Sequence, residues 1–188
     1  MIYILLSYLM TTTNCDKYKP RWDPNFWNNL DDKYNDITNC YSYAFNFVEK
    51  YGDDKVQPGE LSGEKFLNYS CSDIEEKVKR DYDINYLNKL ETKDDIVPCN
   101  HYKIALVLDD KNEDKDYHFY RQDLNGYWSH KTGKDPVSNK DASGNLIKDP
   151  KYADRNYKRK NDNDNNYYIF CNYYSVPFND GPKFRYNY

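Results

Sequence analysis

The pattern of apolar and polar positions predicts helices in the first half of the chain. After Cys40, apolar residues recur at the i, i+3, i+4, i+7 spacing of one buried helix face, and Gly52 is a natural C-terminal stop. Thr38 or Asn39 can cap the N-terminus of this helix. Its apolar face is formed by Tyr41, Ala44, Phe45, Val48 and Tyr51. The pattern therefore predicts a helix that begins at Cys40.

Two more helices are expected before the pattern changes. Ser72-Asp73-Ile74-Glu75 has the form of a capping box, so a helix should begin at Ser72 and end near Asp81. A shorter helix is expected from Ile84 to Leu90.

From Tyr102 onward the pattern predicts strands. Residues 102–108 form a nearly continuous apolar run, as in a central strand covered on both faces. Residues 117–122 and 127–131 predict a hairpin that turns through Asn125-Gly126, and residues 167–177 predict a final strand. Helices followed by strands favour an α+β domain, with the N-terminal helices packed on a mostly antiparallel β-sheet.

The length of 188 residues fits one domain, which we place at residues 14–188. Residues 1–13 are interpreted as a signal segment or as a gene-model extension in which Met10 is the true start. The apolar stretch from Ile2 to Met10 is far shorter than the roughly 20 residues that span a bilayer. No Lys or Arg precedes it and no small-residue cleavage site follows. Stable membrane insertion is therefore not expected.

Composition excludes one class of partner. The net charge of −4 gives no broad attraction to nucleic acid, and the basic residues are interleaved with acidic ones. The 22 tyrosines can cover core and surface together, because each has an apolar ring and a polar tip.

The five cysteines are an odd number. In an oxidising compartment they fit two disulfides plus one free thiol, whereas in the cytosol all five would be thiols; the pairing cannot be deduced. No C-x-x-C pair is present, so a structural zinc site is not supported, and Cys99-Asn100-His101 is interpreted as a loop that leads into a strand. We expect no metal and no organic cofactor.

Cys40 and two histidines suggest nucleophilic catalysis. A helix N-terminus supplies partial positive charge to Cys40, His118 could take the thiol proton, and His130 could orient His118. The two histidines share a face only if the hairpin turn is Leu124-Asn125-Gly126, with Gly126 left-handed and Tyr120 opposite His130. A two-residue Asn125-Gly126 turn would put them on opposite faces.

This arrangement resembles the papain-like cysteine peptidases of the NlpC cell-wall hydrolase type, over roughly Asp36 to Val176. The residues beside the cysteine depart from that family, because Asn39 and Tyr41-Ser42 replace its usual Asp and Ser-Gly. The segments around His118, His130 and Asp141-Ala142-Ser143-Gly144 also look like a poorly characterised papain-like group of bacteria and large DNA viruses.

The resemblance implies a papain-like fold and a monomeric thiol hydrolase, that is, a cysteine protease or amidase. Cys40 would attack an amide, peptide or isopeptide bond and form a thioester acyl-enzyme. The substrate would be a peptide, a peptidoglycan peptide or a ubiquitin-like tail, and the protein would be secreted, or in the host cytoplasm if viral. Further oxyanion or substrate candidates are Asn39, Tyr41, Gln57 and Trp128.

Alternatives stay open. Cys40 could be a small core residue, and Asp141 or Asp149, which look like turn formers, could replace His130 as the orienting group. The same Cys/His pair could serve an acyltransferase. A different class is a non-catalytic binding module on a papain-like scaffold, with its aromatic-rich surface used for recognition.

Overall fold

The computed structural model describes residues 15–30, 36–47, 55–82, 86–111, 115–159 and 165–178. At its centre lies a five-stranded sheet in the order β1-β5-β2-β3-β4, and every pairing in it is antiparallel. The strands are β1 (Asn88–Leu90), β2 (His101–Asp109), β3 (Asp116–Gln122), β4 (Trp128–Ser129) and β5 (Ile169–Pro177). With helices earlier in the chain, this sheet confirms the α+β class.

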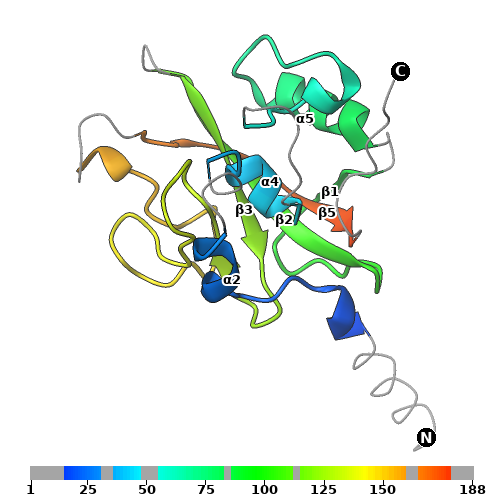
Figure 1. Ribbon diagram of the computed structural model, residues 1–188, viewed down its shortest axis with the longest axis vertical. Coiled ribbons are helices and arrows are strands. Elements are labelled where there is room, and N and C mark those ends of the chain that lie inside the picture. Colours follow the sequence, from blue (N-terminus) through cyan, green and yellow to red (C-terminus); the bar gives the residue numbers. More distant parts are fainter. Residues whose placement is uncertain are drawn as a thin grey trace, which may run out of the picture.

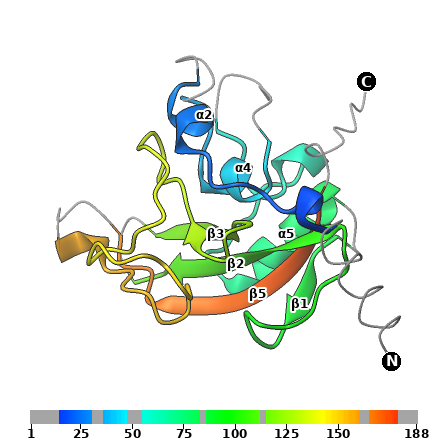
Figure 2. The same cartoon turned by 90° about the horizontal axis from the view of Figure 1, so that it is seen from below.

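Three α-helices accompany the sheet within the described residues (Figure 1). They are α2 (Pro24–Asn28), α4 (Cys40–Ala44) and α5 (Cys71–Tyr82), and three 3₁₀ turns are η1 (Asp16–Tyr18), η2 (Glu60–Ser62) and η3 (Tyr157–Arg159). Figure 2 shows α2 and α4 on the same side of the sheet. Residues of α4 and α5, such as Tyr41 and Ile74, share one apolar cluster with Ile104 and Leu106 of β2. The helices therefore bury one face of the sheet.

The opposite face is covered by the long segment between β4 and β5, drawn yellow to orange in Figures 1 and 2. Ala105 and Val107 of β2 alternate with the helix-facing positions, and they pack with Trp128, Ile147 and Tyr167 in a second cluster. Because both faces are covered, the apolar run of β2 is buried almost throughout, as the sequence predicted.

Much of the tyrosine content fills the interior. The buried tyrosines include Tyr41, Tyr43, Tyr86, Tyr102, Tyr117, Tyr120, Tyr167, Tyr173 and Tyr174. Their hydroxyls reach polar partners at the edges of the clusters: Tyr41 donates to Asp81 at 2.8 Å and Tyr102 to the Ala44 carbonyl at 3.0 Å. A tyrosine-rich core is thus compatible with burial, since the rings pack and, within the described residues, the polar tips are bonded, with the Tyr120 hydroxyl as an exception among the tyrosines named.

Two disulfides join Cys15 with Cys99 and Cys71 with Cys171, and Cys40 is the free thiol. This is the arrangement of two disulfides plus one thiol that the odd cysteine count allowed. The bridged residues are 84 and 100 positions apart. By loop entropy, each bridge destabilises the unfolded chain by about 4–5 kcal/mol.

The helix predictions need three corrections. Helix α4 ends at Ala44, and Asn46, with φ of 58°, takes the chain out of helical geometry; the expected continuation through Val48 to Gly52 lies outside the described residues. Helix α5 begins at Cys71, so Ser72 is not its cap: the Ser70 hydroxyl instead accepts from the Asp73 N–H at 3.2 Å.

The third correction concerns the helix expected from Ile84 to Leu90, whose end is a strand in the structure and whose first two residues lie outside the described ranges. Asn88–Leu90 forms β1 and pairs with β5. The local pattern is too short to choose between helix and strand, and pairing with the free edge of β5 decides the outcome.

Within the described ranges, the structure contains no helix that is both long and apolar enough to cross a bilayer. The interpretation of residues 1–13 as a signal segment or gene-model extension lies outside the residues described.

Candidate functional site

The turn between β3 and β4 has the three-residue form that the sequence argument required. The Asp123 N–H donates to the Tyr127 carbonyl at 2.9 Å, and Gly126 has a φ of 84°. The resulting register pairs Gln122 with Trp128 and Arg121 with Ser129. Continued by one step, it sets Tyr120 opposite His130, as predicted.

This register brings the two histidines together. His118 Nε2 and His130 Nδ1 are 2.9 Å apart. His130 Nε2 lies 3.2 Å from the Lys140 carbonyl, which can only accept a hydrogen bond, so His130 carries its proton on Nε2. His130 Nδ1 is then the acceptor and His118 Nε2 the donor of the shared bond, which leaves His118 Nδ1 unprotonated.

Both imidazoles are neutral at neutral pH. Burial lowers the pKa of His118 well below its ordinary value, and the neighbouring His130 lowers it further. Burial also lowers the pKa of His130 to about 4, although its bond to the Lys140 carbonyl opposes the shift. Among the described residues, neither imidazole forms a salt bridge with a carboxylate that could hold it charged.

Asn39 sets the start of α4. Its side chain accepts from the Ser42 N–H at 3.0 Å, and the Ser42 hydroxyl accepts from the Asn39 N–H at 2.8 Å. Of the two caps that the sequence allowed, the structure uses Asn39. The reciprocal bonds place Cys40 at the first helical position.

The Cys40 thiol is buried and protonated. Its side chain lies in the helix-side cluster, and Sγ donates to the Tyr117 carbonyl at 3.9 Å. Burial raises the pKa of Cys40 to about 12, and the nearby carboxylate of Asp116 adds to that rise. Backbone groups of Cys40 and Tyr41 at the start of α4 lower the pKa of the thiol, but burial outweighs them.

Cys40 and His118 make their contacts on different faces of β3. Cys40 belongs to the cluster that contains Tyr117 and Phe119. His118 lies between these two positions, so its side chain leaves the other face of the strand, where it packs with Tyr120 and stacks on Tyr167 at 5.1 Å. In the described part of the chain, no hydrogen bond joins Cys40 Sγ to His118.

The other candidates have structural contacts. Trp128 and Tyr41 are completely buried. Gln57 accepts from the Tyr117 hydroxyl at 2.7 Å. Asp141 accepts backbone N–H bonds in its own turn, and Asp149 accepts from the Tyr173 hydroxyl. Neither aspartate is hydrogen-bonded to His118 within the residues described, whereas His130 is.

A buried ion pair was not expected from the sequence. Arg121 and Asp123 form an ion pair at 2.9 Å, with side chains 0% and 1% exposed. The Arg121 guanidinium also lies 4.1 Å from the centre of the Tyr43 ring and donates to its carbonyl. The one signal in the sequence was an arginine within an otherwise aromatic strand, followed two residues later by an aspartate.

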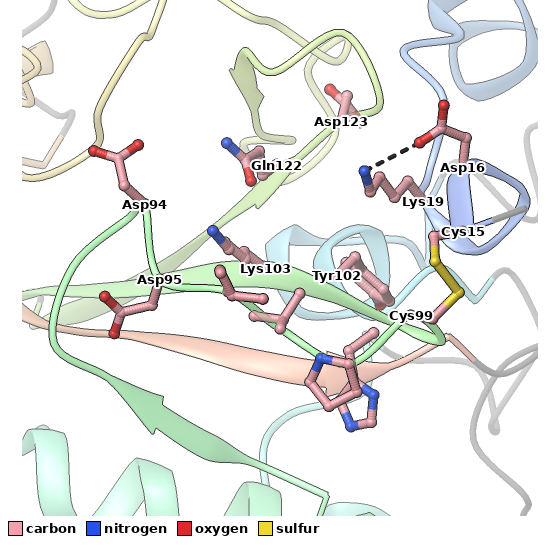
Figure 3. A pocket seen from close by; sticks show the side chains of 14 residues that line it. Cys15, Asp16, Lys19, Asp94, Asp95, Cys99, Tyr102, Lys103, Gln122 and Asp123 are labelled. Carbon is pink, nitrogen blue, oxygen red and sulfur yellow. Dashed lines mark hydrogen bonds and ion pairs between the residues drawn. A yellow bond between two sulfur atoms is a disulfide. The ribbon is translucent and has the colours of Figure 1, made fainter. Parts of the chain in front are cut away.

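Two cavities lie near these clusters. One, of about 530 Å³, is lined by His130 together with Asp116, Thr132 and Tyr157; we call it the His130 cavity. The other, of about 490 Å³, has the Cys15–Cys99 disulfide in its wall, with Lys19 and Lys103 around it (Figure 3). No group of three or more potential metal ligands occurs in the part of the chain described.

These features define a disulfide-bonded α+β domain whose buried Cys/His cluster is uncharged. No family model matches the chain, and no solved structure matches it either. The chain is 38% identical over 135 residues to a protein described as insoluble matrix shell protein 1, from Ruditapes philippinarum. The match spans 72% of this chain and 81% of that relative. The chain therefore belongs to the family of insoluble matrix shell protein 1.

This membership overturns the expected peptidase. The relative is a matrix protein of a shell, so the assignment to papain-like, NlpC-type hydrolases is wrong, and with it the predicted amide hydrolysis through an acyl-enzyme and the description as protease or amidase. The buried thiol gives a physical reason, since a nucleophile must ionise to attack. The catalytic roles of Cys40, His118 and His130 remain predictions from sequence, now without the activity that motivated them.

Proposed function

We propose that this protein is a non-catalytic structural component of an insoluble extracellular matrix and acts by binding. The observation that carries the proposal is the 38% identity to insoluble matrix shell protein 1 across 81% of that relative. A similarity that extends over most of both chains supports a shared kind of role, here in a shell matrix or a comparable insoluble material.

The chemistry of the Cys/His cluster supports a role without turnover. The thiol stays protonated at neutral pH, and its proton is directed at a backbone carbonyl of β3. The imidazole pair is uncharged and buried. The thiol and the histidine pair are therefore buried on separate faces of β3: the histidines are hydrogen-bonded to each other, and Cys40 and His130 are each bonded to a backbone carbonyl.

The covalent framework supports a location outside the cell. Disulfides persist in oxidising surroundings and are rare where thiols are kept reduced. Two disulfides that close long loops would keep the domain folded after secretion without the help of a partner protein. We keep as part of the proposal that the partner is neither a nucleic acid nor a membrane.

Binding to insoluble solids tests the proposal directly. The full disulfide-bonded chain would be mixed with a neutral polysaccharide powder, a protein fibre and a calcium mineral, then centrifuged and washed with salt. We expect most of the protein to remain with at least one solid, and the reduced and alkylated chain to lose that selectivity. A chain that stays in the supernatant with every solid would contradict a matrix role.

Thiol reactivity tests the absence of catalysis. Iodoacetamide should leave Cys40 unmodified in the native protein and label it once the chain is unfolded, because only the thiolate reacts and burial suppresses it. Peptide and amide substrates should remain intact. If the native protein hydrolysed such a substrate and the Cys40→Ser variant did not, the proposal would be wrong.

A further inference from the structure

The His130 cavity has the size of a ligand site. Its volume of about 530 Å³ lies within the range of small-molecule pockets in proteins, roughly 300–1,000 Å³. His130 forms part of the wall, so the cavity reaches the histidine pair, whereas Cys40 is not among its lining residues.

Two carboxylates of the lining already accept hydrogen bonds from the protein. Asp116 accepts hydrogen bonds from the Tyr167 hydroxyl at 2.6 Å and from the Asn165 amide at 2.9 Å. Asp141 accepts only backbone N–H groups. The two remaining charged side chains of the lining, Asp135 and Lys140, are of opposite sign, and His130 is neutral. The wall therefore carries three carboxylates against one ammonium, which disfavours an anionic ligand.

Two hydroxyls on the wall are loosely held. Thr132 Oγ1 is 3.4 Å from His130 Nδ1, which already accepts from His118 at 2.9 Å. Ser138 Oγ accepts from the Lys140 N–H at 3.0 Å, but its own proton has only the Lys140 carbonyl, at 3.4 Å, as a partner among the described residues. Hydroxyl hydrogen bonds are normally about 2.7–2.8 Å long, so both groups would gain by turning toward a ligand. A hydroxyl both donates and accepts, which suits a ligand that does the same.

An aromatic side chain completes the wall. Tyr157, the first residue of η3, lines the cavity and is half-buried. Its ring lies 5.8 Å from that of His130. A tyrosine ring offers an apolar surface to C–H groups of a ligand, while the neighbouring hydroxyls and carboxylates meet its polar groups.

From this combination we propose that the His130 cavity binds one unit of a neutral, hydroxyl-rich ligand, that is, a saccharide. The inference deepens the proposed matrix function and rests on it, because it names the chemistry of the partner. The Thr132 and Ser138 hydroxyls and the carboxylates would bond sugar hydroxyls, and Tyr157 would cover a C–H face.

The disulfide-lined cavity provides a matched control. It is of similar volume, but Figure 3 shows its wall carrying several charged side chains, with Lys103 and Asp95 among them. The Lys103 ammonium donates to the Lys93 carbonyl at 2.6 Å and forms no salt bridge in the described part of the chain. Among the described residues that line it, this wall contains no serine or threonine, so it lacks the hydroxyls that would bond a saccharide in the His130 cavity.

Calorimetry with soluble probes tests the inference on the full disulfide-bonded chain. The probes are tetrasaccharides of glucose, mannose and N-acetylglucosamine, with a sulfated disaccharide and free lysine as charged comparisons. We expect at least one neutral probe to bind with a Kd of about 1 mM or tighter, as one sugar unit in such a pocket allows. Binding by a charged probe alone, or by none, would overturn the inference.

Variants locate the site. Tyr157→Ala should weaken the neutral probe at least tenfold, and Thr132→Val, which keeps the shape and removes the hydroxyl, should weaken it several-fold. Tyr157→Phe keeps the ring and should change the Kd about twofold at most, and so should Lys103→Met in the control cavity. Circular dichroism checks that each variant is folded. Unchanged binding in folded Tyr157→Ala and Thr132→Val would place the ligand elsewhere and refute the assignment.

The two proposals can fail separately. A chain that stays with insoluble solids but binds none of the neutral probes disproves the saccharide site and leaves the matrix role standing. A chain that hydrolyses amides through Cys40 disproves the matrix role, whatever the sugar measurements show.

Discussion

Two buried polar clusters on the hairpin of β3 and β4 differ in ionisation: one is neutral and the other is an ion pair. His118 and His130 are uncharged, and their polar atoms are bonded to each other and to the Lys140 carbonyl. A few residues along the same strands, Arg121 and Asp123 form an ion pair with almost no exposure. Both clusters are removed from water, yet only one of them keeps its charges.

The difference lies in what the fold supplies as a counter-charge. Asp123 accepts from both Nε and Nη2 of Arg121, and its other oxygen accepts from Ser129 at 2.5 Å. The Tyr43 ring and carbonyl complete the arginine's surroundings. The histidines have no such partner, so the cost of desolvation decides in favour of their neutral forms. Residue type alone does not fix the charge of a buried group.

The largest loss of stability is expected when one charge of the ion pair is removed. Arg121→Met leaves Asp123 buried without its partner, and we expect the free energy of unfolding to fall by about 3–5 kcal/mol. Urea unfolding at pH 7 measures it. Adding Asp123→Asn to this variant should restore part of the loss, because the uncompensated charge is then gone. A loss below about 1 kcal/mol in the single variant would show that water reaches the pair.

The histidine pair should make the free energy of unfolding depend on pH. The ion pair should not do so near neutral pH. The unfolded chain binds protons on histidine below about pH 6.5, whereas folded His130 binds its proton only near pH 4. The contribution of His130 to the free energy of unfolding is therefore fully present above pH 6.5 and is lost as the pH drops toward 4. Between pH 7 and 5 we expect a loss of about 2 kcal/mol from His130 alone.

The double variant His118→Gln/His130→Gln is the control for this pH effect. The buried carboxyls Asp116 and Asp123, whose pKa values are raised by burial, act in the opposite direction but remain in both proteins. The difference between the two pH profiles isolates the histidines. Parallel profiles would mean that the imidazoles are already charged or reach solvent.

The smallest effect is expected at the turn that joins the two strands. Gly126 has a φ of 84°, and an added Cβ would meet no other atom within 4 Å. Gly126→Ala should therefore cost only the backbone preference, about 1 kcal/mol. The histidine contact should survive, and imidazole NMR signals can check it. A shift of register would instead separate His118 from His130 and abolish the pH effect.

Local signals in the sequence predicted the parts of the fold that local chemistry controls. The apolar run of β2 identified a central strand, and Gly126 identified the turn that sets His118 beside His130. Asn39 was one of two expected caps, and it is the one used. These features depend on neighbours in sequence, so a single chain contains the information.

Other features depend on residues that meet only in three dimensions. The strand at Asn88–Leu90 exists because β5 offers an edge, and the pairing of four cysteines follows from the same assembly. The protonation state of Cys40 was the most consequential feature that the sequence did not predict. A helix start at Cys40 suggested a reactive thiol, but burial among aromatic rings raises its pKa, and burial is not visible in local sequence.

The position of β5 has a consequence for how the protein is made. This strand lies between β1 and β2 in the sheet, although it is the last strand that the described chain provides. While the chain emerges, β1 has no neighbour, the inner edge of β2 is open, and Cys71 has no partner. Oxidation of Cys71 to its correct partner, Cys171 of β5, must therefore wait until β5 has left the ribosome. During synthesis, the protein would need a chaperone to shield the open sheet edge.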